Sequence, residues 1–346
     1  MHGNSRQRFG LSILGLTLIV PFALSQNPII PADAKLEKVF GDGLVLTEGV
    51  AVAPDGMVYF SDITFSHVSK EATGKLEAGH IFKFDPVTSK TTIFRSPSGM
   101  SNGLKFDAEG NLIACEGADY GGRRVTRTDM KTGKSYILAG LFEGRPFNAP
   151  NDAALDRKGR IYFSDPRYLG HEPIDQPVMA VYRIDLDGTV HRIITDAGKP
   201  NGVAVSPDQK SLYVVSNDNG STGIGRLPKE ALTHKGRMAL LAYDLADDGT
   251  AKFRKLLVDY APQDGPDGLV CDADGNLWVA VRDETRPGVV VYSPAGKELA
   301  YVPTEIPTNV GFGRGKESKV LYITAGKSLY RIRTNQEGDQ LGGKEK

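Results

Sequence analysis

The sequence predicts an all-β fold, a six-bladed β-propeller whose four-stranded antiparallel blades surround a central channel. Three observations predict this fold. One hairpin-like unit occurs six times along the 346 residues, and no stretch carries the periodicity of a long helix. Most of the units begin about fifty residues apart, which is a spacing typical of propeller blades.

The repeated unit begins with a polar residue and a glycine or other small residue, followed by an alternating apolar stretch. A turn rich in Asp, Gly and Lys then leads into a second run of Val, Ile, Tyr or Phe, as in a β-hairpin. The six units are TEGVAVAPDGMVYFSD (47–62), SNGLKFDAEGNLIACE (101–116), PNDAALDRKGRIYFSD (150–165), PNGVAVSPDQKSLYVVSN (200–217), PDGLVCDADGNLWVAV (266–281) and TNVGFGRGKESKVLYITA (308–325).

A third strand follows most of the hairpins, and a second tight turn and a fourth strand complete each blade. Third strands are expected at His80–Asp85, Val181–Asp185 and Leu241–Asp244. Leu36–Phe40 has strand character ahead of the first full blade, so we expect it to pair near Ser328–Thr334 and close the ring. No linker interrupts the pattern, and residues 26–346 are predicted to form a single domain.

The first 25 residues have the order of a secretory signal peptide. Arg6 and Arg8 precede an apolar run over residues 9–24, and Ser25 is the small residue of a cleavage site. The run is short for a transmembrane helix, and an uncleaved membrane anchor is the alternative. The sequence therefore predicts an exported protein, periplasmic or secreted, whose mature chain does not enter the membrane.

The charge balance and the cysteines exclude several classes of partner and cross-link. The 42 basic and 42 acidic residues cancel, so nucleic acid and anionic membranes are poor candidate partners, and no obligate protein partner is inferred. An even cysteine count permits a disulfide. Because Cys115 and Cys271 fall in strands of distant repeats, two buried free thiols are expected instead.

In a propeller, the innermost strand of each blade lines the channel, so residues at equivalent positions converge on the axis. The residues at the start of that strand are Glu48, Asn102, Asn151, Asn201, Asp267 and Asn309. Turn chemistry explains any single Asn or Asp. It does not explain all six, and Glu48 in particular is not a turn former.

Six oxygen-bearing side chains at one axis indicate a bound cation. Buried carboxylates repel each other and lose hydration, and a divalent ion removes that cost. All the candidate ligands are hard oxygens and none is Cys or His, so calcium suits the site better than zinc, with manganese and magnesium also open. Glu48 and Asp267 would balance the charge of the ion.

Two short segments of the repeats match functional motifs only in part. Gly99–Gly103 matches the G-x-S-x-G pattern of serine hydrolases, but that elbow needs a helix after it. Here a strand is expected, so Ser101 is not predicted to be a nucleophile. Asp272–Gly275 resembles the start of a calcium loop, lacks the full ligand spacing, and is predicted to be a hairpin turn.

Taken together and in order, the motifs resemble the gluconolactonase, senescence-marker-protein and luciferin-regenerating-enzyme family over nearly the whole mature chain. The segments that carry the resemblance are EGVAVAPDG around Glu48, GGRRVTR from Gly121, NAPNDAALDRKGRIYFSDPRY from Asn148, PNGVAVSPD from Pro200 and PDGLVCDADGNLWVA from Pro266. The chain departs from the family in two long connections, Ile63–His80 and Gly170–Pro177, which are expected to rim the pocket and set specificity.

The resemblance implies a catalytic divalent ion held by Glu48, Asn151, Asn201 and Asp267. It also implies that Asp267 is the acid–base residue in a hydrolase that opens a sugar lactone to the aldonic acid. Diisopropyl fluorophosphatase shares this fold and a similar ligand set, so a phosphotriesterase-like or fluorophosphatase-like activity is an alternative. A non-enzymatic calcium-binding propeller is another.

Four further residues are candidates for contact with substrate. Asn102 is expected to orient substrate hydroxyls, and Arg123, Arg124 and Tyr168 are the other candidates. For the two arginines, a surface or inter-blade salt bridge is an equally open role.

Overall fold

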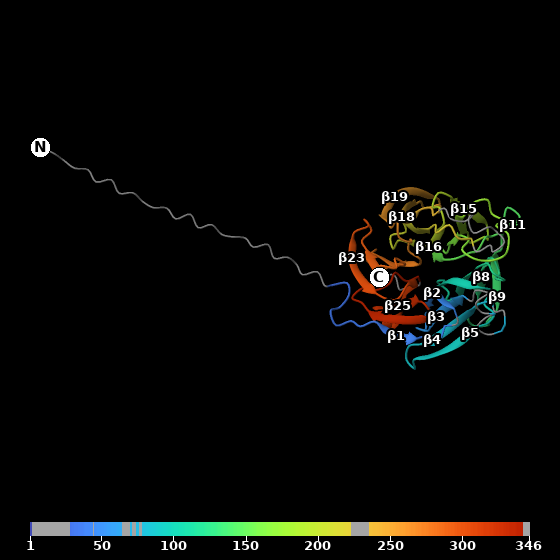
Figure 1. Cartoon of the computed structure of the whole chain (residues 1–346), viewed down its shortest axis with the longest axis horizontal. Helices are drawn as coiled ribbons and strands as arrows, with labels where there is room; N and C mark the ends of the chain where they lie inside the picture. Colours follow the sequence, from blue (N-terminus) through green and yellow to red (C-terminus); the bar gives the residue numbers. More distant parts are fainter. Residues whose placement is uncertain are drawn as a thin grey trace.

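The computed structural model describes residue 1 and residues 28–43, 45–63, 70, 74–75, 78–222 and 235–341. In this part of the chain, six four-stranded antiparallel sheets follow one another around a ring in sequence order (Figure 1). The predicted six-bladed propeller is therefore confirmed. Apart from Met1, the predicted signal peptide lies outside the described residues. No helix among the described residues is long and apolar enough to cross a membrane.

Within each blade the strands run in order from the channel to the outer edge. The first three blades contain β2 (Leu46–Val52), β3 (Val58–Ile63), β4 (His80–Asp85) and β5 (Lys90–Arg95); β6 (Ser101–Phe106), β7 (Leu112–Glu116), β8 (Arg124–Thr128) and β9 (Ser135–Ala139); and β12 (Ala153–Leu155), β13 (Ile161–Asp165), β14 (Ala180–Ile184) and β15 (Val190–Ile194). The other three contain β16 (Pro200–Val205), β17 (Ser211–Asn217), β18 (Met238–Leu245) and β19 (Ala251–Asp259); β20 (Leu269–Cys271), β21 (Leu277–Val281), β22 (Gly288–Tyr292) and β23 (Glu298–Pro303); and β24 (Pro307–Phe312), β25 (Val320–Ala325), β26 (Ser328–Arg333) and β1 (Glu37–Phe40). A two-stranded ribbon and one short 3-10 helix complete the set: β10 (Leu141–Phe142), β11 (Arg145–Pro146) and η2 (Gly315–Glu317).

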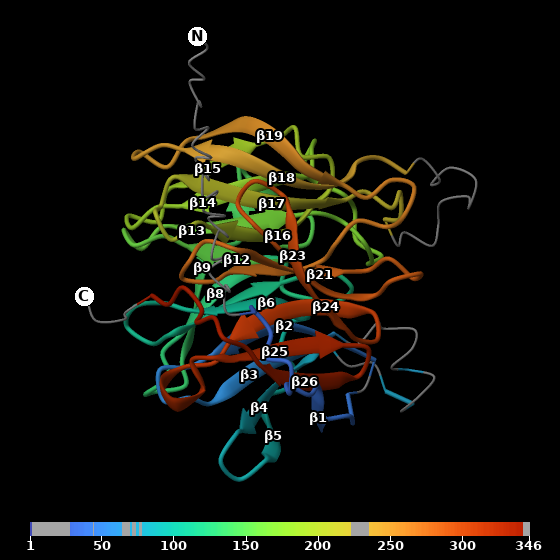
Figure 2. The ribbon, with the colours of Figure 1, turned by 90° about the vertical axis from the view of Figure 1, so that its left-hand side faces the viewer.

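The ring closes by the pairing that the sequence predicted. Strand β1 pairs antiparallel with β26, and Glu37 lies opposite Arg331 (Figure 2). Arg331 Nε also donates a hydrogen bond of 2.9 Å to Glu37 Oε2. Because the first and last strands share one blade, separating any two neighbouring blades would require breaking a continuous ring of packed sheets.

The hairpin turns owe their shape to Asp side chains. Asp272 Oδ1 accepts hydrogen bonds from the backbone N–H groups of Asp274 and Asn276, at 3.0 and 2.8 Å. Gly275 has a φ of 86°, a conformation that costs little for glycine. The segment joins β20 to β21, so it is the hairpin turn that the sequence predicted.

The hydrophobic core lies between blades and consists of large buried side chains from facing sheets. Phe84 of β4 packs against Tyr322 of β25, with ring centroids 6.3 Å apart. Trp278 of β21 contacts Phe312 of β24, with centroids at 5.2 Å. Aromatic contacts between blades bury large areas and hold neighbouring sheets together.

Cys115 and Cys271 are buried and free, as predicted. Burial raises the pKa of both thiols, which keeps them protonated and unreactive.

Glycines allow the inner strands to approach closely around the channel. A Cβ atom on Gly49 would lie 2.3 Å from the carbonyl oxygen of Asn102, and one on Gly202 would lie 2.4 Å from that of Asp267. Contacts this short exclude any side chain. The glycine after the polar residue of the repeat therefore sets the narrow spacing that brings the polar residues together.

At the far end of the inner strands, the C-terminal segment crosses the channel. Asp339 donates its backbone N–H to the carbonyl oxygen of Cys271 at 3.2 Å, and its carboxylate lies 2.8 Å from Arg157 Nη2. Arg314 Nη1 donates to the carbonyl oxygen of Leu341 at 3.2 Å. We call residues 337–341 the C-terminal strap; it joins the third, fifth and sixth blades.

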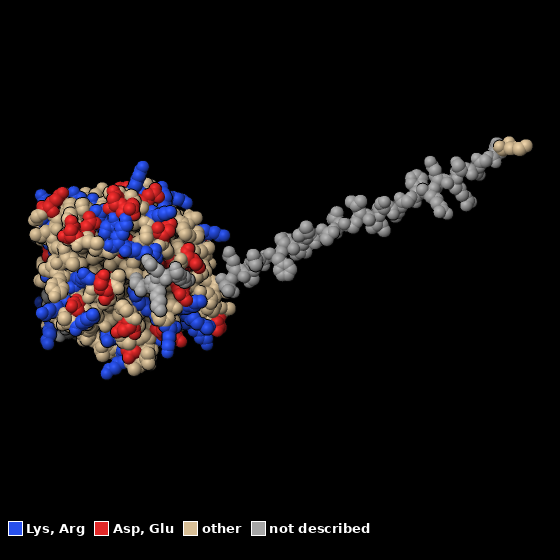
Figure 3. Space-filling view, turned by 180° about the vertical axis from the view of Figure 1, so that it is seen from behind, with Lys and Arg blue, Asp and Glu red and all other residues tan. Residues whose placement is uncertain are grey.

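The surface carries charges of both signs. On the face shown in Figure 3, Lys and Arg side chains are interspersed with Asp and Glu side chains. This distribution agrees with the equal numbers of basic and acidic residues in the sequence.

Candidate active site

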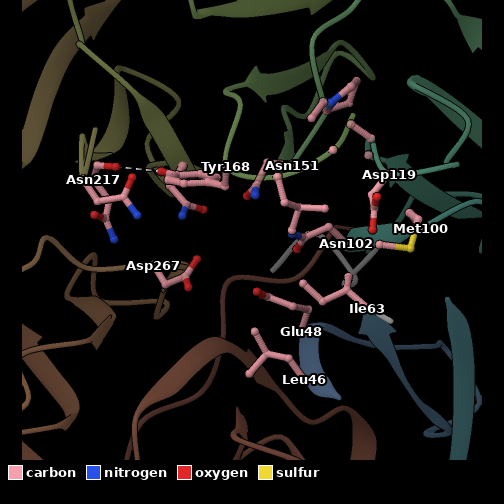
Figure 4. A pocket seen from close by; sticks show the side chains of 18 of the residues that line it. Leu46, Glu48, Ile63, Met100, Asn102, Asp119, Asn151, Tyr168, Asn217 and Asp267 are labelled. Carbon is pink, nitrogen blue, oxygen red and sulfur yellow. Dashed lines mark hydrogen bonds between the residues drawn. The ribbon is translucent and has the colours of Figure 1, made fainter. Parts of the chain in front are cut away.

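A cavity of about 420 Å³ opens at the end of the channel where the inner strands begin. Five of the six predicted ring residues line it: Glu48, Asn102, Asn151, Asn201 and Asp267. The carboxylates of Glu48 and Asp267 both point into this space (Figure 4). The repeat-based prediction that equivalent positions converge is confirmed for these five.

The sixth ring residue, Asn309, does not line the cavity and is buried below it. Its Oδ1 accepts the backbone N–H of Val310 at 2.9 Å, and its side chain also hydrogen-bonds to the buried carboxylate of Asp152. Burial raises the pKa of Asp152, and Lys105, whose Nζ lies 3.9 Å from Asp152 Oδ1, opposes the rise. Asn309 therefore meets a residue of the opposite blade, as expected for convergence on the axis, but its amide binds this carboxylate instead of lining the cavity.

Carboxylates at the ends of second strands fix the chain ahead of the ring residues. Asp165, at the end of β13, accepts the backbone N–H groups of residues 148 and 149 at 2.9 and 2.7 Å, just ahead of Asn151. Asp62, at the end of β3, accepts the N–H of Leu46 at 3.2 Å, just ahead of Glu48. The repeated sequence Phe-Ser-Asp thus positions two of the proposed ligands.

The serine of the same motif joins neighbouring blades at the ring. Ser61 Oγ donates a hydrogen bond of 2.8 Å to the carbonyl oxygen of Asn102. Ser164 Oγ donates one of 2.5 Å to the carbonyl oxygen of Asn201. Both serines are fully buried, so water does not compete for these bonds.

The two carboxylates of the ring have strongly perturbed acidities. Burial raises the pKa of Glu48 well above its ordinary value, and the neighbouring carboxylate of Asp267 raises it further. Burial also raises the pKa of Asp267 to about 6, although Arg282 opposes the rise. Both shifts show that burial disfavours the ionised form of the two carboxyl groups, and the charge of Arg282 only partly offsets this effect.

Arg282 is a cavity residue that the sequence reasoning missed. It directly follows β21, its side chain is 27% exposed, and its Nη1 donates a hydrogen bond of 2.9 Å to Asp267 Oδ2. Ile63 and Gly117 occupy the position equivalent to Arg282, at the end of the second strand of their own blades, and they also line the cavity. This equivalence in the repeat was the signal from which Arg282 could have been identified as a cavity residue.

Two buried polar atoms of the site are acceptors without a donor among the described residues. Within the described part of the chain, Glu48 Oε2 and Asn201 Oδ1 have no hydrogen-bond partner. Buried acceptors without a partner are costly, and a metal ion would satisfy both. No group of three or more His, Cys, Asp and Glu side chains among the described residues is arranged to hold a metal. The donors here are two carboxylates and several amides, a set that fits a hard divalent ion.

Tyr168 lines the cavity, as expected of a substrate-contact candidate. Its hydroxyl donates a hydrogen bond of 3.0 Å to the carbonyl oxygen of Asn217, and the ammonium group of Lys199 lies 4.6 Å from the centre of its ring. Burial raises the pKa of Tyr168 well above its ordinary value, so the phenol is neutral. The ring therefore forms a fixed aromatic wall of the cavity.

Arg123 and Arg124 do not line the cavity, and their expected contact with substrate is corrected. Arg124 Nε donates a hydrogen bond of 2.7 Å to Glu116 on the adjacent strand. Arg123 Nη2 donates one of 2.7 Å to Asp175, and its Nε donates to the carbonyl oxygen of Phe147. Both guanidinium groups are engaged in ion pairs, which is the alternative that the sequence left open.

One side of the cavity is apolar, and loops rim it. Leu46, Ile63 and Met100 lie together there (Figure 4). The other apolar residues of the lining are Ala118, Ala149, Pro150 and Leu169. Glu172, in the long connection after β13, accepts the backbone N–H groups of Asp119 and Tyr120 at 3.0 and 2.8 Å. This pairing holds the two loops together, and Asp119 and Gly170 both line the cavity.

Residues 77–327 match the family model described as the SMP-30/Gluconolactonase/LRE-like region. The chain belongs to this family. The family resemblance drawn from the repeats is thus confirmed.

Relatives of this SMP-30/gluconolactonase-like chain include named lactonases. The gluconolactonase of Zymomonas mobilis is 29% identical over 254 residues, which cover 71% of this chain and 65% of that protein. A lactonohydrolase of Aspergillus oryzae is 30% identical over 272 residues, covering 73% and 61% respectively. The matches thus span just under two thirds of these relatives' lengths.

Solved structures agree with the family assignment. The structure of a gluconolactonase from Xanthomonas campestris matches with a TM-score of 0.71 at 25% identity, covering 88% of this chain and 91% of that chain. A luciferin-regenerating enzyme matches with a TM-score of 0.64 at 18% identity, covering 88% and 97%, which shows the shared fold.

Proposed function

We propose that this protein is a metal-dependent hydrolase that opens a sugar lactone to the aldonic acid. The observation that carries the proposal is the convergence of Glu48, Asn151, Asn201 and Asp267 on one cavity in a chain of this family. The activities named for its relatives, a gluconolactonase and a lactonohydrolase, support lactone hydrolysis.

The same four residues would hold the ion, and their oxygen donors favour calcium. Bound there, calcium would polarise the lactone carbonyl and stabilise the negative charge that develops on its oxygen. The partnerless Glu48 Oε2 and Asn201 Oδ1 support this assignment.

Asp267 is the proposed general base. Burial raises the pKa of Asp267 to about 6, so its carboxylate is largely ionised at neutral pH and remains basic enough to take a proton. It would remove a proton from water as the water oxygen bonds to the carbonyl carbon. The bond from that carbon to the ring oxygen then breaks, and the proton passes to the departing alkoxide.

Asn102 and Tyr168 would hold the substrate during these steps. The half-buried amide of Asn102 can donate to and accept from sugar hydroxyls. The ring of Tyr168 offers an apolar face, against which the C–H groups of a sugar ring can pack.

A substrate panel tests the proposal. Purified protein with calcium should hydrolyse aldonolactones and leave organophosphate triesters and fluorophosphates intact. Turnover of the phosphorus esters alone would favour the fluorophosphatase-like alternative. Tight calcium binding without turnover of any compound in the panel would favour the non-enzymatic calcium-binding propeller.

We also propose that the protein is exported after cleavage behind Ser25. Arg6, Arg8 and the apolar run over residues 9–24 support this proposal. N-terminal sequencing of protein from the periplasm or the medium should begin at Gln26. An intact Met1 on protein from the soluble cytoplasm would contradict it.

A further inference from the structure

Arg282 introduces a positive charge into the place where the ion is expected. Its Nη1 lies 2.9 Å from Asp267 Oδ2, and the side chain is only 27% exposed. Burial alone would lower the pKa of Arg282, but Asp267 and Glu48 outweigh burial and raise it. Because an arginine guanidinium stays protonated in proteins, Arg282 is a permanent cation beside Asp267.

Among the described residues that line the cavity, Arg282 is the only Lys or Arg. With Glu48 and Asp267 ionised, Arg282 offsets half of their charge. A divalent ion bound by the same carboxylates would then reverse the sign of the site. Because like charges repel strongly in a buried site of low dielectric constant, the ion and the guanidinium oppose each other.

The geometry of the site also weakens binding of the ion. One oxygen of Asp267 already accepts the hydrogen bond from Arg282, so an ion must share that carboxylate with the guanidinium or displace it. Charge-assisted hydrogen bonds of this length are among the stronger ones. Breaking or weakening one reduces the net gain from coordinating the ion.

We propose that Arg282 is an internal counter-ion that holds the metal-free site together and lowers its affinity for the divalent ion. The inference rests on the metal site of the proposed function and extends it to the control of that site's affinity. Such a chain binds its ion only where the ion is abundant. Half of the charge of its two carboxylates remains compensated when the ion is absent.

The test measures calcium binding rather than turnover. Metal-free wild-type protein, Arg282→Gln and Arg282→Lys are titrated with calcium chloride in a calorimeter at 0.15 M salt. Glutamine keeps a hydrogen-bond donor for Asp267 but removes the charge, so Arg282→Gln should bind calcium at least about tenfold more tightly. Arg282→Lys retains the charge and should stay within a few-fold of wild type.

Arg286→Gln is the matched control. Arg286 stands four residues further along the same connection, and its Nη2 donates a hydrogen bond of 2.6 Å to Glu298, outside the cavity. Its removal takes away one arginine charge at the surface, where salt screens it. Calcium affinity of this variant should match that of wild type.

Thermal melting in the presence of a chelator provides a second readout. Without metal, Arg282→Gln should melt at a lower temperature than wild type, because two buried carboxylates lose their counter-ion. Calcium should then raise its melting temperature by more than it raises that of wild type.

Equal or weaker calcium binding by Arg282→Gln would overturn the inference, as would the absence of calcium binding in every variant. Tighter binding by Arg282→Gln in a protein that hydrolyses no lactone would support it and would contradict the proposed function alone.

Discussion

Ser164 Oγ donates a hydrogen bond of 2.5 Å to the backbone carbonyl oxygen of Asn201, across the boundary between the third and fourth blades. The same hydroxyl accepts the backbone N–H of Asp152 at 3.1 Å. One buried serine thus connects the ring residue of one blade to the inner strand of its neighbour. The position of a proposed ligand therefore depends on packing between blades.

Ser164→Ala should destabilise the fold and loosen the site. The loss of a buried hydroxyl that makes two hydrogen bonds should lower the free energy of unfolding by about 1–3 kcal/mol. Calcium affinity should fall several-fold because Asn201 is less well held. Urea denaturation and calorimetry measure both effects, and Ser135→Ala, on the exposed strand β9, is the control. Unchanged stability would show that this link is dispensable.

The buried carboxyl group of Asp165 should make stability depend on pH. Burial raises the pKa of Asp165 to about 7 in the folded chain, whereas an unfolded Asp titrates near its ordinary value of about 4. Protonation is favoured by the folded state, so the stability from this group is present at low pH. It is lost as pH rises through about 7.

Asp165→Asn removes that titration while keeping one acceptor oxygen for the loop ahead of Asn151. Relative to wild type, the variant should become more stable as pH rises from about 5 to 8. Urea midpoints across this range provide the measurement. A constant difference between the two proteins would show that Asp165 does not titrate there.

Asp267→Asn should keep the fold, because the amide still offers one oxygen to an ion. It cannot take a proton near neutral pH. Since general bases contribute roughly a hundred- to ten-thousandfold, kcat should fall by that order. Steady-state kinetics on a lactone would measure the loss, and near wild-type turnover would remove Asp267 from the role of base.

Asn102→Ala should weaken substrate binding, whereas Asp267→Asn should slow the chemical step. If Asn102 only orients substrate hydroxyls, its loss should raise KM and change kcat little. The comparison with Asp267→Asn separates binding from chemistry. A structural ion with no catalytic part predicts that either variant alters the melting temperature and leaves turnover nearly unchanged.

Deleting residues 337–346 should weaken the ring without touching the chemistry. The C-terminal strap makes an ion pair and several hydrogen bonds to three blades at the end of the channel away from the cavity. Since each hydrogen bond contributes about 1 kcal/mol net, the free energy of unfolding should fall by roughly 2–4 kcal/mol. Thermal melting should show the loss while KM stays at its wild-type value. A raised KM would show that the strap also shapes the cavity.

The blades and five ring residues could be predicted because both follow from a repeated pattern. The period defines equivalent strands, and equivalent positions such as Glu48 and Asn151 must face the same axis. The closing strand β1 was predictable for the same reason, since the last blade lacked one strand.

What the repeat could not predict depends on contacts between particular side chains. Asn309 turns away from the cavity to a buried carboxylate, and Arg123 and Arg124 are engaged in ion pairs. Arg282 stands just beyond the end of its repeat unit, where the pattern gives no expectation of residue type. The repeat predicts the position of a residue along the backbone, whereas the hydrogen-bond or ion-pair partner of its side chain determines the direction in which that side chain points.

The central claim is that lactone hydrolysis depends on a divalent ion at Glu48, Asn151, Asn201 and Asp267. Its most direct test is the rate of aldonolactone hydrolysis by wild-type protein before chelation, after chelation and after calcium is restored, with metal content verified by elemental analysis. The account predicts that activity is lost with the metal and recovered with calcium. Full activity in protein shown to be metal-free would contradict it.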